Sequence, residues 1–289
     1  MQIDASPHAW LEDRGPRLSL VGGIDDATGK VVGAIFREQE DQYGYFQIIE
    51  QIVERYGCPL AFYHDRHTMF PSLSQQARQD ESVEEQLRGT KTPTQLGRLF
   101  TQLRSTSIAA RSPQAKGRIE RLWGTFQDRL VSELPLENAC TIEHANAVLQ
   151  AFVPRFNARF AIAAAEPEVA WQAFPDALRP QDCFCWQEER TVTNDNTISY
   201  KGQRVQFLPT DQRLSWVRCR VQVHEHFNGD LRIVFQGQTV PSRLAPPDRV
   251  ASAPSRTVKT EARATPSPQR PSPKADHPWR KRFSASSRS

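Results

Sequence analysis

Three acidic residues stand at the ends of predicted core elements, far apart in the sequence. Asp4 lies in or just after the first predicted strand, Asp65 ends a later strand, and Glu120 lies near the start of a long predicted helix. Carboxylates are hard oxygen ligands of the kind that Mg²⁺ prefers. A lone glutamate on a helix is usually just solvated, so the case for Glu120 depends on the other two carboxylates and on the elements that carry them.

The stretch with the most specific pattern is SPQAKGRIERLW at residues 112–123. A serine followed by proline predicts a helix start, because the hydroxyl caps free amides and proline fits the first helical position. Glu120 falls about 100° around the helix from Ile119, at the edge of the apolar stripe, where a carboxylate can reach a cleft. The apolar residues that define this stripe recur at helical spacing: Ile119, Leu122, Trp123, Phe126, Leu130 and Leu134.

The segments before this stretch predict an α/β layer. Residues 18–24 and 31–36 read as the two strands of a hairpin around a turn at 25–30. Residues 43–56 show helical periodicity and residues 60–64 predict a third strand. Further along, residues 94–103 and 142–160 predict helices and 107–110 a short strand, whereas the polar stretch 71–93 is interpreted as a mobile insertion or a loosely packed helix.

A second unit follows the catalytic-core candidate. We expect the core at residues 1–165, a proline-containing connector at 166–184, a small β-barrel at 185–242 and a disordered tail at 243–289. The barrel prediction rests on alternating segments at 191–193, 197–200, 204–208, 219–226 and 231–235, with hairpin-turn residues between them. Six prolines and eight serines in residues 251–289 are typical of disorder.

The charge is distributed unevenly along the 289 residues. The net charge is +4, but residues 251–289 alone carry +7 and the remainder carries −3. A basic tail fits a polyanion such as DNA, although it is weak support by itself. No signal peptide or membrane-spanning run is recognisable, so we expect a soluble, cytoplasmic protein without a membrane partner. The five scattered cysteines form no C-x-x-C pair, which argues against disulfides and zinc.

The three acidic segments together resemble a known family. Gln2-Ile3-Asp4, Tyr63-His64-Asp65 and the Ser112–Glu120 stretch are similar to the integrase core that retroviral integrases and DDE transposases share. The last motif is the most specific, and the similarity is closest to ISNCY-type bacterial insertion-sequence transposases. It covers about residues 1–240, because a small C-terminal β-barrel also follows the core in that group.

The resemblance implies an RNase H-like α/β fold, with a mixed sheet flanked by helices. It implies that Asp4, Asp65 and Glu120 are catalytic and hold two Mg²⁺ or Mn²⁺ ions. Two such ions activate the nucleophile and stabilise the departing 3′ oxygen in phosphodiester hydrolysis and strand transfer. The implied partners are transposon ends, target DNA and further copies of the chain. Helix-turn-helix units usually precede this core, and we expect this chain to lack them.

Several alternatives stay open at this level. Asp25 and Asp26 compete with Asp4 as the first carboxylate, and we reject them because exposed aspartates are expected in a hairpin turn for the turn alone. Arg66 and His67 follow Asp65 where retroviral enzymes have Asn-Gly, and Arg66 could either bias the metal site or contact a phosphate. Three basic residues near the start of the long predicted helix are candidate DNA-binding residues or, equally, part of a solvated helix start: Lys116, Arg118 and Arg121.

The function predicted from the sequence is therefore that of a DNA transposase or integrase. Two alternatives remain: an RNase H-like nuclease, and an inactive remnant that only binds DNA. The sequence does not reveal the transposon ends, the target preference or the oligomeric state.

Overall fold

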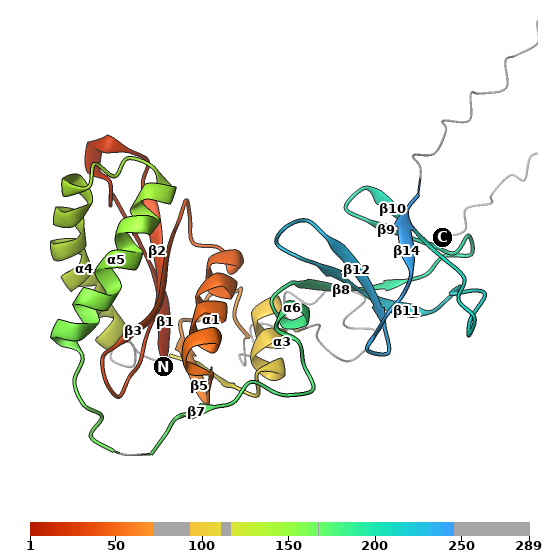
Figure 1. Cartoon of the computed structure of the whole chain (residues 1–289), viewed down its shortest axis with the longest axis horizontal. Helices are drawn as coiled ribbons and strands as arrows, with labels where there is room; N and C mark the ends of the chain where they lie inside the picture. Colours follow the sequence, from red (N-terminus) through yellow and green to blue (C-terminus); the bar gives the residue numbers. More distant parts are fainter. Residues whose placement is uncertain (72–92, 111–116, 167, 246–289) are drawn as a thin grey trace, which may run out of the picture. The chain divides into compact units, whose positions relative to one another are not determined.

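The computed structural model describes residues 1–71, 93–110, 117–166 and 168–245 (Figure 1). By contacts, Met1–Ala245 form one unit. Three earlier predictions fall outside the described residues: most of the insertion at 71–93, the helix start at Ser112, and the basic tail beyond residue 245. Among the described helices, none is long and apolar enough to cross a membrane.

A five-stranded mixed sheet forms the centre of the fold. Its strand order is β3-β2-β1-β5-β6, in which β1, β2 and β3 pair antiparallel while β5 and β6 run parallel to β1. The strands are β1 (Gln2–His8), β2 (Leu18–Ile24), β3 (Val31–Arg37), β5 (Ala61–His64) and β6 (Thr106–Ala109). The predicted α/β layer is thus confirmed as a mixed sheet flanked by helices.

The β2–β3 hairpin has the bounds that the sequence predicts to within one residue. All seven residues of β2 are buried, which matches its continuous apolar run. The turn between the strands is held by Asp25, whose Oδ2 accepts hydrogen bonds from the Thr28 amide at 3.1 Å and the Thr28 hydroxyl at 2.5 Å. The turn is therefore fixed by the residue type that the sequence marks as a turn former.

Helices cover both faces of the sheet. On one face, α1 (Gln42–Tyr56) and α3 (Gln95–Gln102) share a buried cluster with residues such as Ile3 and Phe62. On the other face lie α4 (Gly117–Leu136) and α5 (Ile142–Phe160). Short elements join these layers: the 3₁₀ turn Glu12–Arg14, and the paired strands β4 (Cys58–Pro59) and β7 (Trp171–Gln172).

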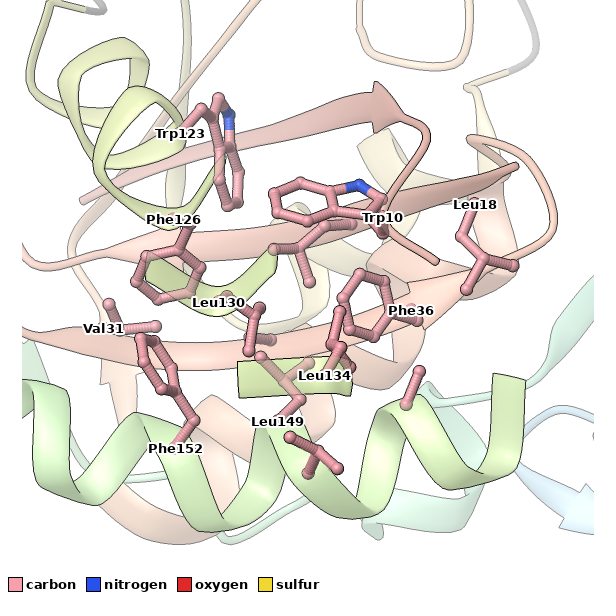
Figure 2. Packing of buried hydrophobic residues seen from close by; sticks show 14 of the residues in the cluster. Trp10, Leu18, Val31, Phe36, Trp123, Phe126, Leu130, Leu134, Leu149 and Phe152 are labelled. Carbon is pink, nitrogen blue, oxygen red and sulfur yellow. The ribbon is translucent and has the colours of Figure 1, made fainter. Parts of the chain in front are cut away.

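The larger core lies between the sheet and helices α4 and α5 (Figure 2). Phe126 is fully buried there and its ring meets those of Phe152 and Phe156 edge-on, with centroids 5.2 and 4.8 Å away. Edge-on aromatic contacts add to the free energy gained from burial. The apolar stripe predicted for the long helix is the face that packs here, since each of its six residues is buried.

A connector leads from the core to a second set of strands. It contains the short helix α6 (Pro180–Cys183), and it is held to α3 by Arg98. The Arg98 guanidinium donates to the carbonyl oxygens of Cys183 and Cys185, at 3.1 and 2.7 Å. Burial lowers the pKa of Arg98 to about 10, and it remains cationic at neutral pH. A buried arginine of this kind needs those carbonyls to replace water.

The strands after the connector form two small antiparallel sheets. Their orders are β14-β10-β9 and β13-β12-β11-β8, and buried residues of both sheets share one cluster. The strands are β8 (Trp186–Thr191), β9 (Thr197–Tyr200), β10 (Gln203–Phe207), β11 (Arg220–Glu225), β12 (Leu231–Phe235), β13 (Gln238–Thr239) and β14 (Ser242–Leu244). The closed barrel and the domain limits stay predictions.

One predicted strand in this region was wrong. The first strand is β8, Trp186–Thr191, rather than residues 191–193. Its middle is the polar and mostly charged run Gln187-Glu188-Glu189-Arg190, which lacks the apolar alternation used to find strands. β8 lies at the edge of its sheet, where charged and half-exposed side chains are tolerated and even protective.

Replacing Phe126 by alanine should lower the free energy of unfolding by about 3–5 kcal/mol, because the site is fully buried and closely packed. The matched control is Leu136→Ala on the same helix, where the side chain is 79% exposed and a change within about 0.5 kcal/mol is expected. Urea denaturation of the two variants measures both values. Similar losses in the two variants would contradict the assigned core.

Candidate active site

The register of two parallel strands brings Asp4 and Asp65 to neighbouring positions. Gln2 of β1 is paired with Tyr63 of β5, and the Tyr63 amide donates to the Met1 carbonyl at 2.8 Å. Asp4 follows two residues after Gln2 on β1, and Asp65 follows two residues after Tyr63, directly beyond the end of β5. Because side chains alternate along a strand, Asp4 lies on the same face as Gln2, and we expect the Asp65 carboxylate near that face as well. Asp65 is the first residue after β5 ends.

The pKa of Tyr45 responds to the charges of both aspartates, but burial and Glu40 have larger effects. Tyr45 is a buried residue of α1, and its hydroxyl donates to Glu40 Oε1 at 2.7 Å. Burial raises its pKa well above the usual value, the Glu40 carboxylate adds to the rise, and the negative charges of Asp4 and Asp65 add further.

Helix α4 is attached along β1 by three side-chain hydrogen bonds. Gln2 Oε1 accepts from the Ile119 amide at 3.1 Å. Asp4 Oδ2 accepts from the Trp123 indole at 3.2 Å. In the third bond, the Gln127 amide group donates to Ser6 Oγ at 3.1 Å.

The spacing of these bonds explains why they repeat. The strand partners are two residues apart and the helix partners four apart. A strand advances about 6.6 Å over two residues and a helix about 6 Å over four, so the two elements stay in step. Glu120 lies in the first turn of α4, one residue after the amide that Gln2 holds, and it is exposed. The sequence analysis named Gln2 and Trp123 but assigned neither of them a hydrogen bond between β1 and α4.

A glycine makes room for this attachment. Gly22 of β2 lies opposite Asp4 in the antiparallel register. A Cβ atom added there would come within 2.8 Å of the far edge of the Trp123 ring and 3.2 Å of the Gly33 carbonyl oxygen. Gly22 is therefore required for the close approach of the tryptophan that holds Asp4.

The residue before Asp65 fixes the chain at the end of β5. His64 is fully buried, and its ring stacks on Phe70 with centroids 4.2 Å apart. Its Nδ1 lies 2.5 Å from the Asp65 carbonyl oxygen, and its Nε2 lies 2.7 Å from Ser107 Oγ. A carbonyl can only accept, so Nδ1 carries the proton, and in the neutral ring the serine hydroxyl donates to Nε2. The sequence analysis quoted His64 but gave it no role.

The side chain of Asp65 is also held. Its Oδ1 accepts a hydrogen bond from the His67 amide at 3.0 Å, so the chain folds back directly after the strand. The motif that departs from the retroviral Asn-Gly, Arg66-His67, thus supplies a backbone donor to the carboxylate. The Arg66 side chain is exposed in this turn.

The predicted DNA-binding residues have different surroundings. Arg118 forms an ion pair with Asp26, Nε to Oδ1 at 3.3 Å, while Arg121 is exposed on α4. Lys116 lies outside the described residues. Asp26 also accepts from Gln2 Nε2 at 2.9 Å. The turn aspartate that was rejected as a first carboxylate is therefore part of the surroundings of α4, and the phosphate contacts of these basic residues stay predictions.

The carboxylate oxygens of Asp4 and Asp65 are ligands of the kind that a hard divalent cation prefers. Within the ranges that the structure describes, however, no three His, Cys, Asp or Glu side chains are grouped so that they could hold a metal ion. The convergence of Asp4, Asp65 and Glu120 on shared ions accordingly stays a prediction.

Comparisons with known proteins give the family context. The chain is 35% identical over 252 residues to the putative transposase y4bF of Sinorhizobium fredii, which covers 86% of this chain and 52% of that protein. It is 32% identical over 237 residues to the transposase for insertion sequence IS1202 of Streptococcus pneumoniae, covering 80% and 47%. This chain is related to bacterial transposases. The resemblance predicted from the sequence is confirmed, and the chain spans about half the length of these curated relatives.

Two further comparisons add little. No family model matches the chain. Among solved structures, a simian T-cell lymphotropic virus intasome in complex with the PP2A regulatory subunit B56 gamma aligns with 85% of this chain and 78% of its own. The TM-score is 0.40 and the sequence identity 13%. This likeness is too distant to assign a residue or an activity.

The variant Gly22→Ala should lower the free energy of unfolding by about 1–3 kcal/mol, because the added methyl group displaces a buried tryptophan. Gly124→Ala is the control, since a Cβ there meets nothing within 4 Å on an exposed helix position. That change should be neutral or stabilise by up to about 1 kcal/mol. Denaturation curves followed by tryptophan fluorescence compare them. Equal stability of both variants would refute the close approach.

Proposed function

We propose that this chain is the catalytic part of a DNA transposase, which hydrolyses phosphodiester bonds at transposon ends and joins them to target DNA. The observation that carries the proposal is the pairing of β1 with β5, which brings Asp4 and the residue after β5, Asp65, to neighbouring positions, together with the bond from Asp4 to Trp123 of α4. The relation to bacterial transposases gives it its substrate class. The mixed sheet with helices on both faces supports the RNase H-like fold that the resemblance implies.

In this proposal Asp4, Asp65 and Glu120 are the residues that hold Mg²⁺ or Mn²⁺. Two bound ions supply activation of the attacking oxygen and stabilisation of the departing 3′ oxygen. The protein's own part is to hold the carboxylates in place. The Trp123 indole orients Asp4 through Oδ2, and the His67 amide orients Asp65 through Oδ1. Such supporting hydrogen bonds position ligand oxygens before an ion arrives.

The proposal extends to partners and setting. Transposon ends and target DNA are the substrates, and a homo-oligomer brings two ends together. In this proposal the exposed Arg66 and Arg121 contact phosphates of the bound DNA, whereas Arg118 would first have to leave Asp26. A cytoplasmic setting follows from DNA as the substrate.

The first test replaces the three carboxylates one at a time, by Asp4→Asn, Asp65→Asn and Glu120→Gln. With Mg²⁺ or Mn²⁺ and DNA from the flanks of the gene, each variant should lose cleavage and strand transfer by at least about 100-fold, because metal contributes several kcal/mol to the transition state. Asp128→Asn, exposed on the same helix, is the charge-matched control and should retain activity.

The products separate the candidate functions. Joined products support a transposase, simple nicks alone support a nuclease, and DNA binding without either reaction supports an inactive remnant. Full activity of Glu120→Gln would show that Glu120 is not a catalytic residue. The roles of Asp4 and Asp65 would then be decided by their own variants.

The second test asks whether His64 positions Asp65. In His64→Asn the amide nitrogen falls near the Nδ1 position, so the bond to the Asp65 carbonyl can be kept. In His64→Gln the amide group falls near Nε2, so only the contact with Ser107 can be kept. We expect kcat to fall about 10- to 100-fold more in the Gln variant, with little change in KM.

Stability provides the control for this comparison. Both variants lose the ring that stacks on Phe70, so their unfolding free energies should fall by similar amounts. A difference in kcat at similar stability assigns a positioning role. Equal kcat values in the two variants, or decreases in kcat that follow the decreases in stability, would show that His64 only packs.

A further inference from the structure

An open cavity of about 500 Å³ lies where the β2–β3 turn meets the ends of α1 and α5. Its volume is within the range of small-molecule sites in proteins. Thr28 and Lys30 of the turn, Arg55 and Tyr56 of α1, and Asn157 with the following residues of α5 line it. The nearby walls also include apolar side chains of Val31, Val153 and Ile162.

The charged side chains that line this cavity are all positive. Lys30 and Arg55 both line it, and no acidic side chain does. Within the described residues, neither cation takes part in an ion pair, and the Lys30 ammonium lies 4.9 Å from the centre of the Tyr56 ring. Two like charges lining one cavity repel each other, and a bound anion is attracted to both and offsets that repulsion.

The cavity is held in shape by hydrogen bonds. The Asn157 side chain accepts from the Val31 amide and donates to the Val31 carbonyl, both at 2.8 Å. The Ile162 amide donates to the Thr28 carbonyl at 2.9 Å. Asp25 in turn fixes Thr28. A site whose walls are fixed in this way loses little conformational entropy when a ligand binds.

The same turn also contacts the candidate active site. Asp26, next to Asp25, accepts from Gln2 and pairs with Arg118 at the start of α4. Residues 25–30 therefore contribute both to the cavity, through Thr28 and Lys30, and to the contacts at the start of α4, through Asp26.

We propose that Lys30 and Arg55 form an anion site that holds a backbone phosphate of the bound DNA, away from the reacting bond. The inference rests on the proposed function for its occupant. The ammonium and the guanidinium contact phosphate oxygens without reading bases, so the site positions the strand and adds affinity without sequence preference. It is separate from the carboxylates and from the basic residues of α4.

The test measures DNA affinity of the whole chain as a function of salt. Each phosphate contact contributes about 0.9 to the slope of log K against log salt. The double variant Lys30→Gln/Arg55→Gln should bind a duplex of fixed length more weakly and with a slope reduced by about 1. The control is Arg17→Gln/Arg104→Gln, which removes the same charge from two exposed arginines of the core that line no part of the cavity.

A second measurement identifies the occupant. Lys30 should be protected from acetylation, read by mass spectrometry, when the wild-type chain binds DNA, and an acidic peptide at equal charge should not protect it. Equal slopes for the two double variants, or unprotected Lys30 in the DNA complex, would overturn the inference. Protection by the acidic peptide alone would also overturn it, in favour of a protein partner.

The two proposals fail differently. If the double variant behaves like its control while cleavage and strand transfer persist, only the phosphate site is lost. If the wild-type chain binds no DNA, the proposed function and the site that rests on it fail together. Unfolding curves of both double variants verify that the comparison is made between folded proteins.

Discussion

Helix α4 runs in step with strand β1, and three hydrogen bonds of equal spacing hold the two together. The match arises because four helical residues and two strand residues cover nearly the same distance. It determines where the first turn of α4 lies relative to Asp4. The other half of the site depends on a second register, in which Gln2 faces Tyr63. A slip of one residue would turn one carboxylate to the opposite face of the sheet.

Stability and the candidate chemistry share side chains in this arrangement. Trp123 belongs to the main core through its ring and to the site through its indole nitrogen. A half-buried carboxylate such as Asp4 loses contact with water, and a donated hydrogen bond offsets part of that loss. Gly22 is part of the same arrangement, because only a residue without a side chain lets the ring approach β2. Changes made for stability at these positions therefore act on the site as well.

The β2–β3 turn contributes to two regions, the start of α4 and the open cavity. Asp26 pairs with Arg118 at the start of α4, whereas Lys30 lines the open cavity. Turns usually tolerate exposed aspartates for conformational reasons alone. Here Asp25 serves that conformational purpose through Thr28, whereas Asp26 bonds across the sheet. Adjacent residues of one type thus have distinct roles.

The sequence by itself determined the periodic features of this protein. The hairpin, the buried stripe of α4 and the position of Glu120 beside that stripe follow from alternation and helical spacing, which are local properties. The edge strand β8 was misplaced because its charges conceal its alternation. Tertiary structure decided the pairing of β1 with β5, the attachment of α4 and the proton position on His64. Those contacts join residues that are distant in the chain, and no local pattern specifies which distant partner a polar side chain will meet.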